Sequence, residues 1–380
     1  IGSPLLSFLL CSLCTPLQGL GFSNLIYLHM RLEEFYKSVD DSKVNVFFIE
    51  EPESHMHPQM QNVFIRFLTK YYTEKKLQGL ITTHSNEIAR SVGLNSLRVI
   101  RQTEKSKSEL FNLSKFRKSI ENKKVKNVDK ESEFLLQNFF DWFFEIGYSE
   151  LIFADKVILY EGDTERLYIR KLLGMTEFAS LRDNYIAFIQ VGGAYAHNYL
   201  EILTMLKMKS LIITDLDYNK DATTFEIAKN STSTNATINH CYRLIYPEKG
   251  AAYLPSIKEI YEMQTEKGTV ICNDLICVAY QDENSTARTL EEAMLNKFLS
   301  KNVFDKTKRS EWKSIRKNNN LTFTIPNNRN DETDSEFSIR QIVAASSNNK
   351  TDFMYSVVLS GNEEKMLPDY IRKGLLWLAK

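Results

Sequence analysis

The sequence predicts an α/β protein built on parallel β-sheets. Short runs of β-branched and aromatic residues alternate with segments whose apolar residues recur every three or four positions, the pattern of strands alternating with helices. Two of the predicted strands end in paired carboxylates, Glu50 with Glu51 and Asp215 with Asp217. The carboxyl ends of parallel strands form the ligand-binding edge of such sheets, so both pairs are expected at functional sites.

The composition is that of an ordinary globular protein. The chain has 380 residues, enough for two or three domains with a sizeable core, and 43% of them are hydrophobic. Lys and Arg together number 48, as do Asp and Glu, so the formal net charge is zero. Balanced charge argues against a strongly basic surface, although a local basic groove can still bind DNA.

Neither the cysteines nor the N-terminal residues point to an exported or membrane protein. The five cysteines are too scattered for a disulfide framework, and Cys11-x-x-Cys14, with no second Cys/His pair nearby, is expected to be buried rather than zinc-bound. Residues 1–10 are apolar but lack a basic flank and an initiating Met, so we expect the chain to start inside a domain. No apolar stretch is long enough to span a membrane, so a cytoplasmic protein without a membrane partner is expected.

Residues 1–102 are predicted to be the C-terminal part of one α/β domain. Apolar runs and helical spacing predict a buried strand, a helix opened by a proline, and two further strands, at 43–49, 58–72, 80–83 and 96–101.

Residues 103–154 are predicted to form a charged linker followed by a helical connector. The linker, 103–129, is rich in Lys and includes the run Lys123-Lys-Val-Lys126, whereas 132–152 are aromatic with helical spacing. A run of lysines is compatible with a solvated surface and with contacts to a DNA backbone, and both interpretations stay open.

A second α/β unit with a parallel sheet is predicted over 155–300, followed by a mostly helical extension over 301–380. Its expected strands are 156–160, 186–191, 211–214 and 275–280, and its expected helices are 165–173, 195–208 and 290–299. The polar segments 222–239 and 312–338 are expected to be loop or irregular, and the closing helices are expected at 355–359 and 370–379.

The first strand-end cluster suits nucleotide hydrolysis. Glu50 would hold Mg²⁺ and Glu51 would polarise the attacking water, which are the two carboxylate roles of a Walker B motif. His84 follows the next strand, where an imidazole could contact the γ-phosphate. Two carboxylates alone would fit a capped acidic turn better, and the spacing to His84 favours the functional interpretation.

These residues resemble the ABC-type ATPases of the SMC/RecF kind. Phe47-Phe-Ile-Glu-Glu-Pro-Glu53, Met56-His-Pro58 and Thr82-Thr-His-Ser85 are similar to their Walker B, D-loop and switch histidine, and Gln18-Gly-Leu-Gly-Phe-Ser-Asn24 is similar to their signature motif. The resemblance implies that Gly21 and Ser23 contact ATP bound by an opposite subunit. The sequence contains no Gly-x-x-x-x-Gly-Lys-[Ser/Thr] motif, so this chain alone is not expected to hydrolyse ATP. The rest of the ATP site is expected upstream or on another chain.

The second strand-end cluster suits Mg²⁺- or Mn²⁺-dependent phosphodiester chemistry. Glu161 ends one strand, Asp215 and Asp217 follow another, Glu165 lies one helical turn beyond Glu161, and Glu291 starts a later helix. Clustered carboxylates repel unless cations lie among them, and hard oxygen ligands suit Mg²⁺ or Mn²⁺. Two such ions can activate water and stabilise the leaving oxygen of a phosphodiester. Each acidic pair alone would be ordinary surface charge, and their combination favours a two-metal site.

This second cluster resembles a Toprim domain, in which Glu161, Asp215 and Asp217 match the Glu and Asp-x-Asp positions. An ABC-type ATPase followed by a Toprim domain is similar to the OLD (overcoming lysogenisation defect) family of bacterial nucleases, and the resemblance covers nearly the whole chain. It implies that a late lysine, Lys350, assists catalysis by stabilising charge on the phosphate. It also implies an anti-phage setting, as in Gabija or retron-linked effectors, with a helicase or a reverse transcriptase and its RNA/DNA product as partner.

The function predicted from the sequence is a metal-dependent DNA endonuclease regulated by an ATPase domain, acting as a dimer or higher oligomer. The alternative is a non-catalytic assembly module, in which the ATPase part dimerises and the Toprim part binds DNA or a protein. Retention of five carboxylates at one predicted sheet edge favours the enzyme. A topoisomerase or primase would share the Toprim fold, but the sequence shows no DNA-gate, zinc-binding or template-binding module.

Overall fold

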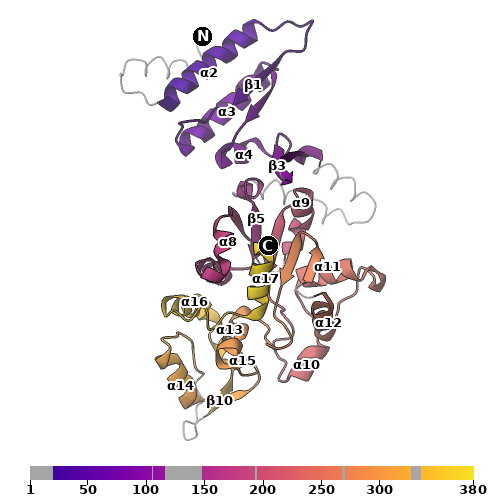
Figure 1. The fold of residues 1–380 in the computed structure, drawn as a ribbon, viewed down its shortest axis with the longest axis vertical. Helices are drawn as coiled ribbons and strands as arrows, with labels where there is room; N and C mark the ends of the chain where they lie inside the picture. Colours follow the sequence, from indigo (N-terminus) through magenta and orange to yellow (C-terminus); the bar gives the residue numbers. More distant parts are fainter. Residues whose placement is uncertain (1–19, 105, 116–147, 193–194, 268–269, 327–334) are drawn as a thin grey trace. The chain divides into compact units, whose positions relative to one another are not determined.

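The computed structural model divides the chain into two compact units, Ile1–Phe153 and Ala154–Lys380 (Figure 1). The structure describes residues 20–104, 106–115, 148–192, 195–267, 270–326 and 335–380. The lysine run at 123–126, the cysteines at 11 and 14 and most of the predicted aromatic connector lie outside these residues. Both units mix helices with strands, and the predicted α/β class is confirmed.

The first unit contains a two-stranded parallel sheet with a helix crossing between its strands. Its elements in order are α2 (Leu20–Lys37), β1 (Val46–Glu50), α3 (Pro58–Glu74), β2 (Gln78–Thr82) and α4 (Asn86–Val92). Pro58 opens α3, as predicted, because a helix's first residue needs no hydrogen bond from its N–H. Phe47 of β1 packs with residues of α2 and α3 in one core, which includes Leu25, Phe64, Ile65 and Leu68.

The strand predicted to be buried at 43–49 is buried on one face only. Phe47 points into the core, whereas the side chain of Phe48 is 74% exposed and its cross-strand neighbour Leu80 is 56% exposed. The prediction was wrong on this point because successive strand residues face opposite sides, and in the described part of the unit helices cover one side.

The strand predicted at 96–101 does not join this sheet in the described residues. β3 (Arg98–Glu104) instead pairs antiparallel with β4 (Lys107–Asn112) in a separate hairpin. Part of the predicted charged linker is therefore a strand. Its charged residues are compatible with a strand because the hairpin has an exposed face, where Leu110 is 62% exposed.

The second unit is built on a five-stranded sheet in the order β6-β5-β7-β9-β8. The strands are β5 (Lys156–Tyr160), β6 (Ile186–Gln190), β7 (Lys209–Ile213), β8 (Val270–Asn273) and β9 (Ile276–Ala279). All neighbours pair parallel except β8, which lies antiparallel at the edge beside β9. The central strands are mostly apolar and buried, apart from Lys156 at the start of β5 and Lys209 at the start of β7, which is typical of parallel strands covered on both faces.

Helices connect these strands. They are α7 (Asp163–Leu172), α8 (Ala179–Arg182), α9 (Leu200–Met205), α10 (Phe225–Asn230), α11 (Ala236–Ile245) and α12 (Ile257–Lys267). The predicted loop at 222–239 was therefore wrong in part. Thr224 and Asn235 cap α10 and α11 with their side-chain oxygens, so the polar residues that suggested a loop are helix caps.

The remaining described residues form helices and a short two-stranded antiparallel sheet that complete the second unit. They are α13 (Leu290–Leu299), β10 (Lys306–Lys308), α14 (Arg309–Asn318), β11 (Glu336–Ser338), α15 (Ile339–Ala345), α16 (Lys350–Leu359) and α17 (Asp369–Ala379). The irregular segment predicted at 312–338 begins inside α14, where Trp312 is fully buried and donates a hydrogen bond to the Phe337 carbonyl at 2.9 Å.

The C-terminal helix α17 packs on the central sheet. A Cβ atom on Gly374 would lie 2.8 Å from Cδ1 of Leu211 in β7, so glycine permits this close approach.

Short 3₁₀ turns occur at Tyr148–Ile152, Thr176–Phe178, Ala196–Tyr199, Pro247–Lys249 and Ser347–Asn349. Across the described ranges, no helix combines the length and the apolar character needed to cross a membrane.

Candidate active site

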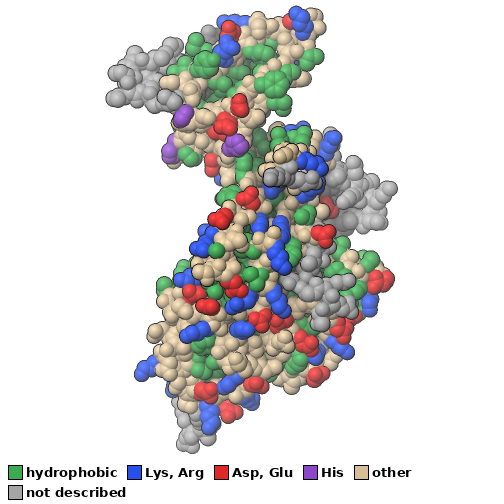
Figure 2. Space-filling view, in the orientation of Figure 1, with side chains coloured by type: hydrophobic (Ala, Val, Ile, Leu, Met, Phe, Trp, Pro, Cys, Tyr) green, Lys and Arg blue, Asp and Glu red, His purple; other side chains and the backbone are tan. Residues whose placement is uncertain are grey.

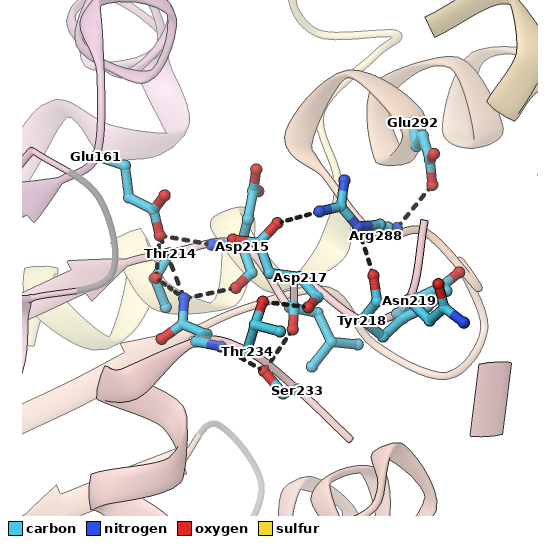
Figure 3. A network of polar contacts seen from close by, with 12 residues as sticks. Glu161, Thr214, Asp215, Asp217, Tyr218, Asn219, Ser233, Thr234, Arg288 and Glu292 are labelled. Carbon is cyan, nitrogen blue, oxygen red and sulfur yellow. Dashed lines mark hydrogen bonds and ion pairs between the residues drawn. The ribbon is translucent and has the colours of Figure 1, made fainter. Parts of the chain in front are cut away.

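The structure brings Glu161 and Asp215 together at one edge of the second unit's sheet (Figure 3). Glu161 follows β5 and Asp215 follows β7, and these strands are parallel neighbours. Oε1 of Glu161 accepts hydrogen bonds from the Asp215 backbone N–H at 3.1 Å and from the Thr214 hydroxyl. The two strand ends are thus tied to each other directly, as their adjacency in a parallel sheet requires.

A buried amide, Asn235, fixes this edge from the side. Its Nδ2 donates to the Thr214 hydroxyl at 2.6 Å, to the Asp215 carbonyl at 2.7 Å and to Glu161 at 3.3 Å. Its Oδ1 accepts the Ile238 N–H, so the cap of α11 holds the amide in place. The sequence prediction missed Asn235, because a cap signal does not reveal what its amide nitrogen touches.

A second buried amide holds the Asp215 carboxylate. Gln281, which follows β9, donates from Nε2 to Asp215 Oδ1 at 2.7 Å and accepts the Leu216 N–H at 2.7 Å. The same Nε2 lies 3.3 Å from the Tyr370 hydroxyl. Gln281 was also missed, because its contact with Asp215 spans 66 residues of sequence.

Asp217 lies in a loop with a left-handed backbone, at φ 49°. Its Oδ1 pairs with Nη2 of Arg288 at 3.0 Å. Asp217 tolerates this conformation better than most residues, since Asp and Asn enter the left-handed region most readily. Arg288 was not predicted as a site residue.

Glu165, Glu291 and Lys350 lie in the first turns of α7, α13 and α16. Oε2 of Glu165 accepts the Gly162 N–H at 2.9 Å and so caps α7. Lys350 Nζ lies 3.2 Å from Oε2 of Glu291, whose side chain is only 4% exposed. The structure thus pairs the predicted late lysine with a predicted carboxylate 59 residues away.

The electrostatics of this edge favour bound protons when no cation is present. Burial, with the nearby carboxylates of Glu291 and Glu161, raises the pKa of Glu165 to about 7. Burial and four neighbouring carboxylates raise the pKa of Asp215 well above its usual range. Burial also raises the pKa of Glu161, against the opposing hydrogen bond from Thr214. A cation among these groups would displace the protons and ionise the carboxylates.

Lys350 carries the opposite charge. Burial disfavours its ammonium form, but the attraction of Glu291 and Asp215 outweighs this effect and raises the pKa of Lys350. The lysine is therefore charged throughout the physiological range of pH.

The donor chemistry of this edge fits a divalent cation. Carboxylate oxygens are the hard ligands that Mg²⁺ and Mn²⁺ select. Oε1 of Glu291 is buried and has no hydrogen-bond partner in the described part of the chain, which is costly for a carboxylate without a cation. In their present rotamers, however, no three described Asp, Glu, His or Cys side chains converge as a metal-binding group.

The first unit brings Glu51 and His84 together. Nε2 of His84 lies 3.2 Å from Oε1 of Glu51, whose backbone is left-handed at φ 41°. Nearby, the buried Glu53 accepts hydrogen bonds from the Thr83 hydroxyl at 2.5 Å and from the His84 N–H at 3.1 Å. Glu53 therefore orders the loop that carries the histidine, a role the sequence prediction did not assign to it.

The other predicted ATP-site residues are Glu50, Ser23 and Gly21. Within the described ranges, Glu50 and Ser23 have exposed side chains and make no hydrogen bond or ion pair with Glu51 or His84. Gly21 lies where α2 meets the loop after β1, and a Cβ atom there would be 2.6 Å from the His55 carbonyl oxygen. Gly21 therefore has a packing reason to be glycine, independent of any nucleotide.

Family models match both units. A model described as AAA ATPase domain matches residues 15–89, and one described as overcoming lysogenization defect protein-like, TOPRIM domain, matches residues 152–217. Endonuclease GajA of Bacillus cereus (strain HuB5-5) is 28% identical over 394 residues, covering 95% of this chain and 53% of that protein. The chain is homologous to GajA and the OLD nucleases.

The relatives differ in extent. The OLD nuclease of Thermus scotoductus is 28% identical over 164 residues, which cover 42% of this chain and 28% of that protein. The present chain thus spans about half the length of GajA, at 53%, and less of the OLD nuclease. The C-terminal region of the Burkholderia pseudomallei OLD protein aligns with a TM-score of 0.34 and 18% identity, covering 60% of this chain and 98% of that one.

The matched regions include most of the predicted site residues. The ATPase match contains Gly21, Ser23, Glu50, Glu51 and His84, and the TOPRIM match contains Glu161, Glu165, Asp215 and Asp217. Glu291 and Lys350 lie beyond both matches, and only the folded structure places them beside this edge.

Proposed function

We propose that this protein is a metal-dependent DNA endonuclease that hydrolyses phosphodiester bonds at the Glu161–Asp215 edge of its TOPRIM domain. The observation that carries the proposal is the meeting of four buried or partly buried carboxylates with one lysine at that edge, in a homologue of nucleases. The resemblance supports an effector role in bacterial anti-phage defence, with the ATPase domain as regulator and assembly as a dimer or higher oligomer.

Two divalent cations, Mg²⁺ or Mn²⁺, would activate the attacking water and stabilise the leaving oxygen. We assign Glu161, Glu165, Asp215 and Glu291 to the first cation and Asp217, with Asp215, to the second. Gln281 and Asn235 act through these residues, because they fix the Asp215 carboxylate and the Glu161 carboxylate respectively.

Lys350 is assigned to the phosphate. Its ammonium group is charged and held beside the carboxylates by Glu291, so it can stabilise negative charge that develops on the scissile phosphate. A lysine paired with a buried carboxylate keeps its position without substrate, which lowers the reorganisation needed when DNA binds.

We further propose that ATP regulates cleavage through the first unit. Glu50 would hold Mg²⁺, Glu51 would polarise water, and His84 would contact the γ-phosphate, with Gly21 and Ser23 facing ATP from an opposite subunit. The pairing of Glu51 with His84 supports the assignment of these two residues. Because these 380 residues contain no P-loop motif, the phosphate-binding loop would have to come from another segment or another chain.

The alternative function is a non-catalytic module that binds DNA or a partner protein. The observation in its favour is the separation of the described acidic side chains, none of which form a ready cation cage. A Mn²⁺ titration separates the two proposals, since a pure scaffold would bind no Mn²⁺ at this edge.

The test of the enzyme is nicking of supercoiled plasmid in Mn²⁺ by the wild type, Asp215→Asn and Asp217→Asn. Asp163→Asn is the matched control, because Asp163 lies on the same edge segment with an exposed side chain. We expect wild type and control to nick and both site variants to lose activity. Equal nicking by all four proteins would overturn the site assignment, and no nicking by the wild type would overturn the activity.

A further inference from the structure

Arg288 forms an ordered bridge at the Asp217 side of the candidate site (Figure 3). It lies in the loop between β9 and α13. Its Nη2 pairs with Asp217 Oδ1 at 3.0 Å, and its Nε donates to the Tyr218 carbonyl at 2.6 Å. Two separate attachments therefore fix the plane and direction of the guanidinium group.

The backbone of Arg288 is held by a buried ion pair between Glu292 and Arg340. The Arg288 backbone N–H donates to Glu292 Oε2 at 2.7 Å, and Glu292 is itself paired with Arg340 through both of its oxygens, at 3.1 and 3.0 Å. The side chains of Glu292 and Arg340 are 5% and 10% exposed. The Arg340 guanidinium also lies over the Tyr218 ring, 4.8 Å from its centroid. A buried, doubly bonded ion pair thus holds Arg288 in place.

Asp217 is equally constrained. Its backbone N–H donates to the Arg288 carbonyl at 3.3 Å, and its own carbonyl accepts the Thr234 hydroxyl at 2.9 Å. The loop is therefore pinned from two sides in its left-handed conformation. Arg288 pairs with Oδ1 of the Asp217 carboxylate, and Oδ2 of Asp217 has no hydrogen bond within the described part of the chain.

We propose that Arg288 is a fixed counter-ion that shares Asp217 with a divalent cation and weakens cation binding there. This inference rests on the proposed function, because that proposal assigns Asp217 to the second cation. Among the described residues, the ammonium group of Lys350 pairs with Glu291 and also attracts Asp215 and Glu165, whereas Asp217 is the carboxylate with which the Arg288 guanidinium forms an ion pair. A cation bound at Asp217 Oδ2 would lie near the guanidinium of Arg288, which its two attachments hold in place. The repulsion between the two positive charges lowers the affinity of this position for the cation.

Because the position at Asp217 binds its cation more weakly, filling of this position determines how cleavage depends on cation concentration. The first cation would bind at lower concentration, and cleavage would begin only when the second position fills. Arg288 is thus a positioning residue that acts through Asp217 and determines the cation concentration needed for activity.

The test is a Mn²⁺ titration followed by electron paramagnetic resonance, with protein folding checked by circular dichroism. The variants are Arg288→Gln, which removes the charge, and Arg288→Lys, which keeps it. Arg372→Gln is the matched control, since it removes a comparable pair, with Glu177 at 3.0 Å, elsewhere in the same unit.

We expect two classes of bound Mn²⁺ in the wild type. Arg288→Gln should tighten the weaker class by about tenfold or more, Arg288→Lys should stay within about threefold of the wild type, and Arg372→Gln should change neither class. An unchanged or weakened second class in folded Arg288→Gln would overturn the inference while leaving the nuclease proposal intact. A wild type that binds no Mn²⁺ would overturn the nuclease proposal itself.

Discussion

Glu165 should make the cation-free protein less stable as the pH rises. Its pKa is raised from 4.5 to about 7, mainly by burial and then by Glu291 and Glu161. Between these values the folded protein holds a proton at Glu165 that the unfolded chain has released. The free energy of unfolding therefore falls as the pH rises through this window. At about 1.4 kcal/mol for each pH unit, the loss is on the order of 3 kcal/mol.

The perturbation that isolates this effect is Glu165→Gln. The amide cannot ionise, yet its oxygen can still accept the Gly162 N–H that caps α7. Relative to the wild type, the variant should gain about 3 kcal/mol between pH 5 and pH 8. Because Glu165, Glu161 and Asp215 titrate together, the difference between the two curves is the quantity to compare.

The assay is urea denaturation in EDTA at pH 5, 6, 7 and 8. Asp163→Asn is the control, because its exposed side chain lies in the same turn of α7. Saturating Mn²⁺ should shrink the difference between wild type and Glu165→Gln at high pH, since a cation stabilises the ionised wild type. Parallel stability curves for wild type and Glu165→Gln in EDTA would refute the reasoning.

Three further predictions each concern a single residue. Lys350→Gln should slow single-turnover plasmid nicking by about 10²- to 10³-fold while Mn²⁺ still binds, and normal nicking would remove the lysine from the mechanism. Gln281→Leu should lower the free energy of unfolding by about 1–3 kcal/mol in urea titrations, because it strips partners from Asp215 and a buried N–H; an unchanged midpoint would contradict this. Gly21→Ala should lower the free energy of unfolding by about 1–3 kcal/mol, because the added Cβ atom would clash with the His55 carbonyl oxygen. Thermal or urea unfolding measures this, and an unchanged free energy of unfolding would show that α2 can shift.

The strand-end carboxylates were predictable because their position follows from local pattern. An apolar run followed by Glu161, and another followed by Asp215, suffices to place both groups at the carboxyl edge of a parallel sheet. The register of β5 against β7 then brings them into contact without further information. The roles assigned to these residues stay predictions until cation binding and cleavage are measured.

The supporting residues were not predictable, because their function depends on distant contacts. Asn235 and Gln281 are ordinary polar residues in sequence, and each acquires its role by reaching a carboxylate 74 or 66 residues away. Arg288 likewise shows no motif. The polar stretch around Asn235 was predicted to be a loop because polar residues are common in loops. In the structure, the Asn235 side chain both caps α11 and contacts the site.

Basic side chains gave little guidance to a DNA path. On the face of the second unit shown in Figure 2, Lys and Arg side chains are interspersed with Asp and Glu, in keeping with the zero net charge of the chain. The sequence alone therefore located the proposed chemistry more closely than it located the proposed substrate-binding surface.

The most direct test of the central proposal is the single-turnover cleavage rate of DNA in saturating Mn²⁺, measured for wild type and Asp215→Asn. We predict cleavage by the wild type that EDTA abolishes, and a loss of at least about 10³-fold in folded Asp215→Asn, because every proposed cation contacts Asp215. Cleavage by Asp215→Asn at the wild-type rate would contradict the proposal.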